Sequence, residues 1–235
     1  MPQKYRFTHP RYGEIEITRN PRARRITLRA RPDALYITLP TIASEKDLEE
    51  ALEKCGDKLI ARQQDIQPEI IDTSYRIEAP LFKFKIEEQE RKNFCARYQS
   101  EKITLLCPTG TSFNGKERQE WVRKIILNAM RRRAQETLPT RLQTLAAQHN
   151  LHYKRVTLRD SRTRWGSCSS NGTISLNIQL VLLPTKLVDY VLLHELCHTI
   201  EMNHSERFWA KLDTLTNTDS RLLRKELKAY RCNMP

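Results

Sequence analysis

Two histidines and a glutamate have the spacing of a metal-dependent hydrolase site. Residues 191–198 read V-L-L-H-E-L-C-H, so His194 and His198 are four residues apart with Glu195 directly after the first. On an α-helix, residues four apart lie one above the other, close enough for both imidazoles to bind one metal ion. Glu195 can then reach a water in the open coordination position of the metal and accept its proton.

A third histidine can complete the metal site if the helix ends in time. His204 follows His198 by six residues, and six residues of straight helix rotate by about 600°, which would turn His204 away from the metal. Asn203 fits the end of the helix, because asparagine tolerates the left-handed turn found there. We therefore expect one Zn²⁺ held by three histidines, with Glu201 as the alternative third ligand because it lies seven residues after His194 on the same helical face.

The surrounding sequence predicts two helices that position these residues. Pro184 fits the first turn of a helix, and apolar residues follow it at helical spacing: Leu187, Val188, Val191, Leu192 and Leu196. Ser205 and Glu206 form the capping start of a second helix. Its buried face would carry Phe208, Trp209, Leu212 and Leu215.

Composition indicates a soluble, cytoplasmic protein. At 235 residues the chain can bury a core in one domain or two small ones. The N-terminus has no apolar segment like a secretory signal, and the longest apolar runs, such as residues 180–183, are too short to span a bilayer. The six cysteines contain no C-x-x-C pair, and we expect free thiols.

The net charge of +13 favours polyanionic partners or phosphorylated substrates. An arginine-rich segment at residues 19–31 could contact phosphates. A basic surface that only keeps the protein in solution explains the same composition equally well. Weak nucleic-acid binding through this surface therefore stays open.

The pattern predicts an α+β fold with two domains. Residues 1–112 would form a basic, β-rich N-terminal lobe with one helix, which Ser44 caps. The turn-forming loop at residues 108–115 marks the boundary. Residues 113–235 would form a mainly helical domain with a β-hairpin beside the metal-binding helix. Its first helix, which starts near residue 116, is expected to kink or restart at Pro139.

The expected hairpin pairs residues 155–159 with residues 173–177 and has a tight turn at Asn171-Gly172. The segment between them contains Arg164 and Trp165. If the hairpin lies along the rim of the zinc site, its strand edge could pair with an extended peptide, and Arg164 could bind a carboxylate or phosphate with two hydrogen bonds.

Structural roles for the same residues remain open. Trp165 could wedge the hairpin onto the helices, and Arg164 could pair with Asp160. Cys168 could join His194 and His198 in a structural zinc site, although Glu195 and His204 would then have no role.

Four motifs together resemble a known family. R-W-G-S-C at 164–168, I-S-L-N at 174–177, H-E-L-C-H at 194–198 and N-H-S-E-R-F-W at 203–209 are similar to the YgjP-like metallopeptidase domain, a relative of the SprT-like and minigluzincin-type zincins. The resemblance is strongest over residues 120–215. It implies zinc ligands at His194, His198 and His204 and a general base at Glu195. Some zincins have a glycine where this chain has Glu201.

These features predict a zinc-dependent hydrolase, foremost a metallopeptidase that attacks peptide bonds of a peptide or protein with zinc-activated water. Two alternatives follow from the basic charge: a metal-dependent nucleotide hydrolase such as a nucleoside triphosphate pyrophosphatase, and a nucleic-acid-associated protease. Against the nucleotide hydrolase, the sequence has no glycine-rich phosphate loop, and phosphate hydrolases more often use carboxylate-held or paired metals. No membrane partner is expected.

Overall fold

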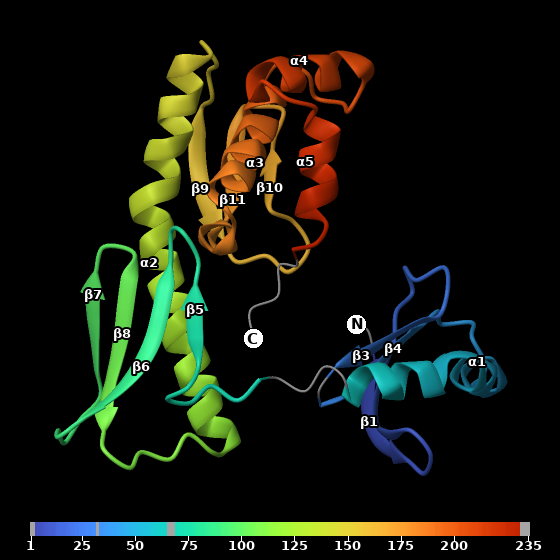
Figure 1. Cartoon of the computed structure of the whole chain (residues 1–235). Helices are drawn as coiled ribbons and strands as arrows, with labels where there is room; N and C mark the ends of the chain where they lie inside the picture. Colours follow the sequence, from blue (N-terminus) through green and yellow to red (C-terminus); the bar gives the residue numbers. More distant parts are fainter. Residues whose placement is uncertain (1–2, 32, 65–68, 231–235) are drawn as a thin grey trace. The chain divides into compact units, whose positions relative to one another are not determined.

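Alternating apolar and polar residues near the N-terminus form a four-stranded sheet in the computed structural model (Figure 1). Strands β1 (Gln3–His9), β2 (Gly13–Arg19), β3 (Thr27–Arg31) and β4 (Ala34–Leu39) lie in the order β1-β2-β4-β3. Residues of β2 and β4 share one core cluster with Leu48 and Leu52 of helix α1 (Glu45–Gln64). Strands β3 and β4 pair antiparallel, and the β-rich character expected for this segment is thereby confirmed.

The structure describes residues 3–31, 33–64 and 69–230, and the chain divides into two units, residues 1–69 and 70–235. The boundary expected at residues 112/113 falls inside the second unit. The reason is a shared core: Phe84 and Leu105 of the preceding strands belong to the same hydrophobic cluster as Ile126 of the following helix. A turn-rich loop therefore connects two parts of one unit here.

The second unit begins with a mixed sheet next to a long helix (Figure 1). Strands β5 (Arg76–Glu78), β6 (Lys83–Gln89), β7 (Cys95–Gln99) and β8 (Lys102–Pro108) take the order β5-β6-β8-β7, with β6 and β8 parallel. Helix α2 (Lys116–Gln148) does not restart at Pro139 but continues through it. Proline removes one backbone hydrogen bond, whereas buried residues on both sides of it, such as Met130 and Leu142, hold both halves in the core.

The third sheet corrects the expected hairpin. Strands β9 (Arg155–Arg159) and β11 (Thr173–Asn177) are parallel neighbours, and β10 (Gly166–Cys168) pairs antiparallel with β11 on its other side. The prediction that residues 155–159 and 173–177 form a hairpin was therefore wrong. The chain reverses once to form β10 and again at the turn before β11, where Gly172 has a φ of +74°, so β11 runs in the direction of β9.

The remaining helices enclose the predicted metal-binding residues. A 3₁₀ helix (Ile178–Leu182) leads into α3 (Thr185–Cys197), which starts after Pro184 as predicted. Helix α4 (Glu206–Thr216) begins at the N-cap Ser205, again as predicted, and α5 (Ser220–Leu227) follows. Helix α3 contacts α2, α4, α5 and β10, so it is surrounded by the rest of the unit.

The end of α3 differs from the expected one. The helix stops at Cys197 with His198 as its C-cap, and Asn203 does not adopt the left-handed conformation, which the described non-glycine residues take only at Ser100, Asn150 and Asn217. The five described cysteines are free thiols, as predicted, and Cys232 lies outside the described residues. In the described ranges, no helix has the length and apolar character needed to cross a membrane.

Candidate metal centre

Three imidazoles converge where α3 ends and α4 begins. His194 lies in the last turn of α3, His198 caps its C-terminus and His204 lies in the turn before Ser205, which starts α4. One candidate ligand atom from each histidine lies within 4.8 Å of the others. The Nε2 atoms of His194 and His204 are 3.0 Å apart. Because α3 ends before His204, the chain can turn and bring His204 towards the other two histidines, as the spacing of the three residues predicted.

The spacing of these atoms fits a small divalent cation. A tetrahedral zinc ion with bonds of about 2.0–2.1 Å holds its nitrogen ligands about 3.3 Å apart. The 3.0 Å between the Nε2 atoms of His194 and His204 is close to that separation. Three imidazole ligands also suit zinc, and they leave a fourth position for water or substrate.

A backbone contact orients one of the three rings. Nδ1 of His198 lies 3.0 Å from the carbonyl oxygen of Glu201. Donation of the Nδ1 proton to this carbonyl leaves Nε2 of His198 as the ligand atom, which is the usual arrangement around a metal-binding histidine. Glu201 thus contributes through its backbone. Within the described residues, its carboxylate does not belong to the candidate ligand group, which consists of the three histidines.

Apolar and aromatic side chains surround the imidazoles and favour the neutral form of His194 and His204. The ring of Phe208 is fully buried, and its centroid lies 4.6–4.9 Å from those of all three histidines. Burial lowers the pKa of His194 to about 3, with further contributions from His198, His204 and Arg224. Burial likewise lowers the pKa of His204. Neutral imidazole is the form that binds a metal, so the lowered pKa values of His194 and His204 suit the two residues to be ligands.

Glu195 is a buried carboxyl group beside this cluster. The residue is only 5% exposed, and burial raises the pKa of its side chain to about 8. Its Oε2 atom and Nδ1 of His194 are buried without a hydrogen-bond partner among the described residues. A buried polar atom without a partner is costly, and a bound cation would favour the ionised carboxylate. The donor set therefore fits a cation on electrostatic grounds as well.

Asn177, the last residue of β11, holds the loop that leads into β10, the strand that contacts α3. The sequence alone gave this residue no separate role. Its side-chain amide donates hydrogen bonds to the carbonyl oxygens of Ser161 (2.7 Å) and Arg164 (2.9 Å), and its backbone N–H donates to that of Trp165 (2.9 Å). Asn177 is 2% exposed. The available signal was a polar residue at the end of the apolar strand I-S-L-N.

Arg164 and Trp165 directly precede β10, and their side chains have different surroundings. The Arg164 side chain is exposed and, within the described part of the chain, makes no ion pair. The expected alternative partner, Asp160, instead accepts a hydrogen bond from Nε2 of Gln179 at 3.0 Å. Trp165 is half-buried and packs against the main core, as the structural alternative predicted.

Cys168 does not join the candidate ligands. In the described residues, the group that could hold a metal ion consists of the three histidines. The Cys168 Sγ lies 3.5 Å from the carbonyl oxygen of Ser169. Burial raises the pKa of this thiol, and the nearby Glu195 adds to the effect. The structural zinc site that would include Cys168 is therefore not supported by the geometry.

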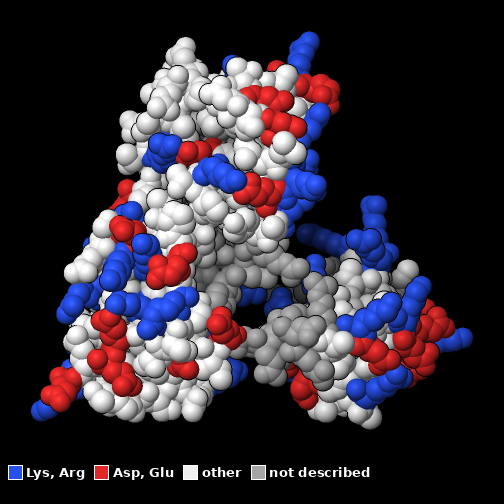
Figure 2. Space-filling view, viewed as in Figure 1, with Lys and Arg blue, Asp and Glu red and all other residues white. Residues whose placement is uncertain are grey.

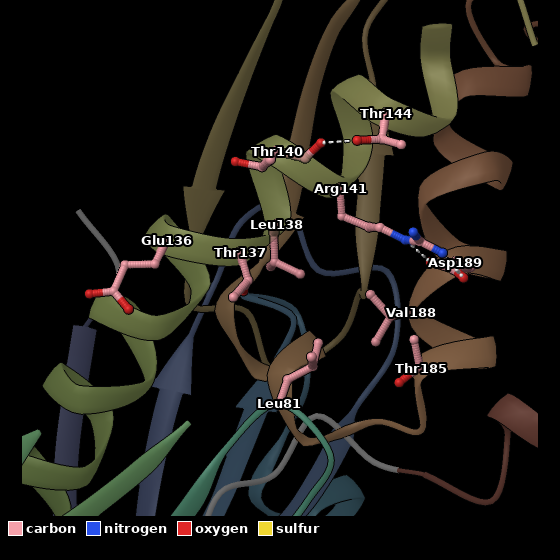
Figure 3. A pocket seen from close by; sticks show the side chains of 10 residues that line it. All are labelled: Leu81, Glu136, Thr137, Leu138, Thr140, Arg141, Thr144, Thr185, Val188 and Asp189. Atoms are coloured by element: carbon pink, nitrogen blue, oxygen red, sulfur yellow. Dashed lines mark hydrogen bonds and ion pairs between the residues drawn. The ribbon is translucent and has the colours of Figure 1, made fainter. Parts of the chain in front are cut away.

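A separate pocket of about 310 Å³ lies between the middle of α2 and the first turns of α3 (Figure 3). Arg141 and Asp189 border it and form a two-fold hydrogen-bonded ion pair, with both N···O distances 2.7 Å. Leu81, Leu138 and Val188 supply apolar lining. The pocket is at the opposite end of α3 from His194, and none of the predicted site residues lines it.

Comparison with known proteins identifies the class. A family model described as the YgjP-like metallopeptidase domain matches residues 24–230, so the chain belongs to this family. Among solved structures, the metallopeptidase zymogen abylysin of Pyrococcus abyssi has 20% sequence identity and a TM-score of 0.37, and the match covers 42% of this chain and 100% of that one. The comparison with curated proteins gave no match.

Replacing His204 should show whether His204 or Glu201 is the third ligand. We expect His204→Ala to weaken zinc binding about 10²-fold or more, because one of three coordinating nitrogens is lost, whereas Glu201→Ala retains the Glu201 carbonyl contact to His198 and leaves affinity within a few-fold. Competition with a chromogenic chelator would measure both. Equal affinity of His204→Ala and the wild type would exclude His204 as a ligand.

The metal-free protein should lose stability as the pH rises, because of Glu195. Its pKa is about 8 in the folded protein against an ordinary value of 4.5, so the stabilisation is complete below about pH 4.5 and is lost as the pH rises through 8. Glu195→Gln should match the wild type near about pH 5 and exceed it by on the order of 3 kcal/mol near about pH 9, at ~1.4 kcal/mol per pKa unit.

Denaturant unfolding in the presence of a chelator would test this, with the exposed Glu49→Gln as the control. A stability difference between Glu195→Gln and wild type that is the same at both pH values would show that the carboxyl group titrates normally.

Proposed function

We propose that the protein is a zinc-dependent metallopeptidase with His194, His198 and His204 as ligands and Glu195 as the general base. The observation that carries this proposal is the convergence of three imidazoles next to the buried Glu195, whose Oε2 atom has no hydrogen-bond partner among the described residues. Membership of the YgjP-like metallopeptidase family supports peptide bonds as the target.

Glu195 would carry out the proton transfers of the reaction. When bound, zinc would supply a Lewis acid that polarises the scissile carbonyl and makes a water molecule more acidic. The Glu195 carboxylate would accept the proton of the attacking water and then deliver it to the departing amine. A group that is 5% exposed exchanges few protons with bulk solvent, so the proton would stay in the site between these two steps.

The edge of β10 offers a place for the substrate backbone. The strand lies at the end of the order β10-β11-β9, so one of its sides has no strand neighbour in this sheet, and it contacts α3. An extended peptide would add to such an edge through main-chain hydrogen bonds. Arg164, which is exposed and lies two residues before the strand, would bind a substrate carboxylate, while Trp165 would shape the adjacent surface.

In the composition of this chain, the feature that favours the nucleotide and nucleic-acid alternatives is the net charge of +13. Figure 2 shows Lys and Arg interspersed with Asp and Glu on the visible face of each unit. The candidate ligands form one group of three imidazoles, whereas phosphoryl-transfer enzymes often use paired metals with carboxylate ligands. Peptide hydrolysis is therefore the function that the geometry supports best.

The test is a comparison of wild type with Glu195→Gln on two substrate panels. We expect the variant to bind one zinc per chain and to lose about 10²–10⁴-fold in kcat on a peptide mixture, because general-base catalysis contributes about that much. Mass spectrometry would identify the products, and atomic absorption the zinc.

Nucleoside triphosphates form the second panel in the same experiment. Pyrophosphate release that the variant loses would replace the peptidase proposal with nucleotide hydrolysis. Peptide cleavage that is unchanged in Glu195→Gln would refute the role of this residue as the base.

A second prediction concerns Arg164. For peptides that carry a carboxylate near the cleaved bond, we expect Arg164→Gln to raise KM about 10-fold with little change in kcat, because a charged hydrogen-bonded pair of about 1.5 kcal/mol is lost. Arg162→Gln, an exposed arginine of the same loop, serves as the matched control. Equal effects of both substitutions would reduce the role of Arg164 to general positive charge.

A further inference from the structure

We propose that Gly166 is a positioning residue: the space left by its missing side chain is the seat of the Glu195 carboxyl group. The contact between Gly166 and Glu195 does not depend on the proposed function, but its effect on catalysis rests on that proposal. Gly166 is the central residue of the R-W-G-S-C motif, and neither metal binding nor the contacts of Arg164 explains why a glycine stands there.

The contact is direct. A Cβ atom added at Gly166 would lie 2.6 Å from Oε1, 2.7 Å from Cγ and 2.9 Å from Cδ of Glu195. Carbon atoms of separate residues normally approach to about 3.5–4.0 Å. Even the smallest side chain at position 166 would therefore occupy space that the Glu195 side chain now fills.

Backbone conformation does not account for the glycine. The glycines with a positive φ are Gly13, Gly110, Gly115 and Gly172, and Gly166 is not among them. It lies in strand β10, paired in register with Leu176. Any L-residue could adopt this backbone conformation, so the restriction at position 166 is steric and comes from Glu195.

Neither side of the contact is free to retreat. Directly before β10, the carbonyl oxygens of Arg164 and Trp165 accept hydrogen bonds from Asn177 of β11, which fixes the start of the strand. On the other side, Leu192 and Leu196 of α3 are fully buried in the main core. An added methyl group would thus displace the carboxyl group rather than the strand or the helix, and it would leave the histidines where they are.

The activity test uses the zinc-loaded full-length protein. We expect Gly166→Ala to lower kcat about 10²-fold, the effect of displacing a catalytic group by about 1 Å, with KM within a few-fold and zinc content unchanged. Gly56→Ala is the matched control, because its Cβ would meet Tyr12 at 2.5 Å in the other unit, far in sequence from Glu195. It should leave kcat of the folded protein unchanged.

The stability test needs no activity. In the metal-free protein, the fall in Tm caused by Gly166→Ala should shrink by at least about half when Glu195 is replaced by alanine, because the contact is then absent. If Gly166→Ala alone does not fold, recovery of folded protein in Gly166→Ala/Glu195→Ala has the same meaning. An equal fall in Tm in both backgrounds would overturn the proposal.

The two tests distinguish the two proposals. Coupling in Tm without peptidase activity in the wild type would leave Gly166 as the seat of Glu195 and refute the proposed function. Peptidase activity that depends on Glu195, with no coupling in Tm and unchanged kcat in Gly166→Ala, would support the function and refute the role of Gly166.

Discussion

The candidate site depends on the burial of α3 on nearly all sides. This helix contacts two helices that follow it, the long helix α2 and strand β10, and its leucines 192 and 196 lie at 0% exposure. A helix enclosed in this way cannot shift by a fraction of a turn without opening a cavity, since protein interiors are close-packed. The positions of His194 and Glu195 are consequently as rigid as the core itself, which is what a site built on a helix needs.

The same burial creates an electrostatic cost that a metal would offset. Apolar surroundings lower the pKa of His194 and raise that of Glu195, so both groups are held in their uncharged forms. Two of their polar atoms have no hydrogen-bond partner among the described residues. Burying these polar atoms without partners lowers the stability of the metal-free protein at the proposed site. A bound cation would interact favourably with the neutral nitrogens and with a carboxylate at the same time, and so would offset this cost.

Local rules of sequence were sufficient to predict how the three candidate metal ligands are brought together. The i, i+4 spacing of His194 and His198, the start of α3 after Pro184 and the N-cap at Ser205 each depend on residues within one or two helical turns. Rotation per residue showed that the helix must end before His204 can face the other two histidines, and α3 does end at Cys197. The end of α3 was missed, because the chain leaves the helix through His198 without a left-handed residue.

Features that depend on long-range pairing could not be derived in this way. A strand pattern does not record its partner, so the parallel pairing of β9 with β11 was mistaken for a hairpin. Only contacts between distant residues settle such questions.

Gly166 shows the same limit at the scale of one residue. In a sequence, a glycine indicates conformational freedom, which suggests a turn or a positive φ. Here the backbone is an ordinary strand, and the constraint is the carboxyl group of Glu195, 29 positions further along the chain. The motif around Gly166 and the motif around His194 are therefore two halves of one packing arrangement: the second contains the proposed reactive groups, and the first shapes the space that the Glu195 side chain occupies.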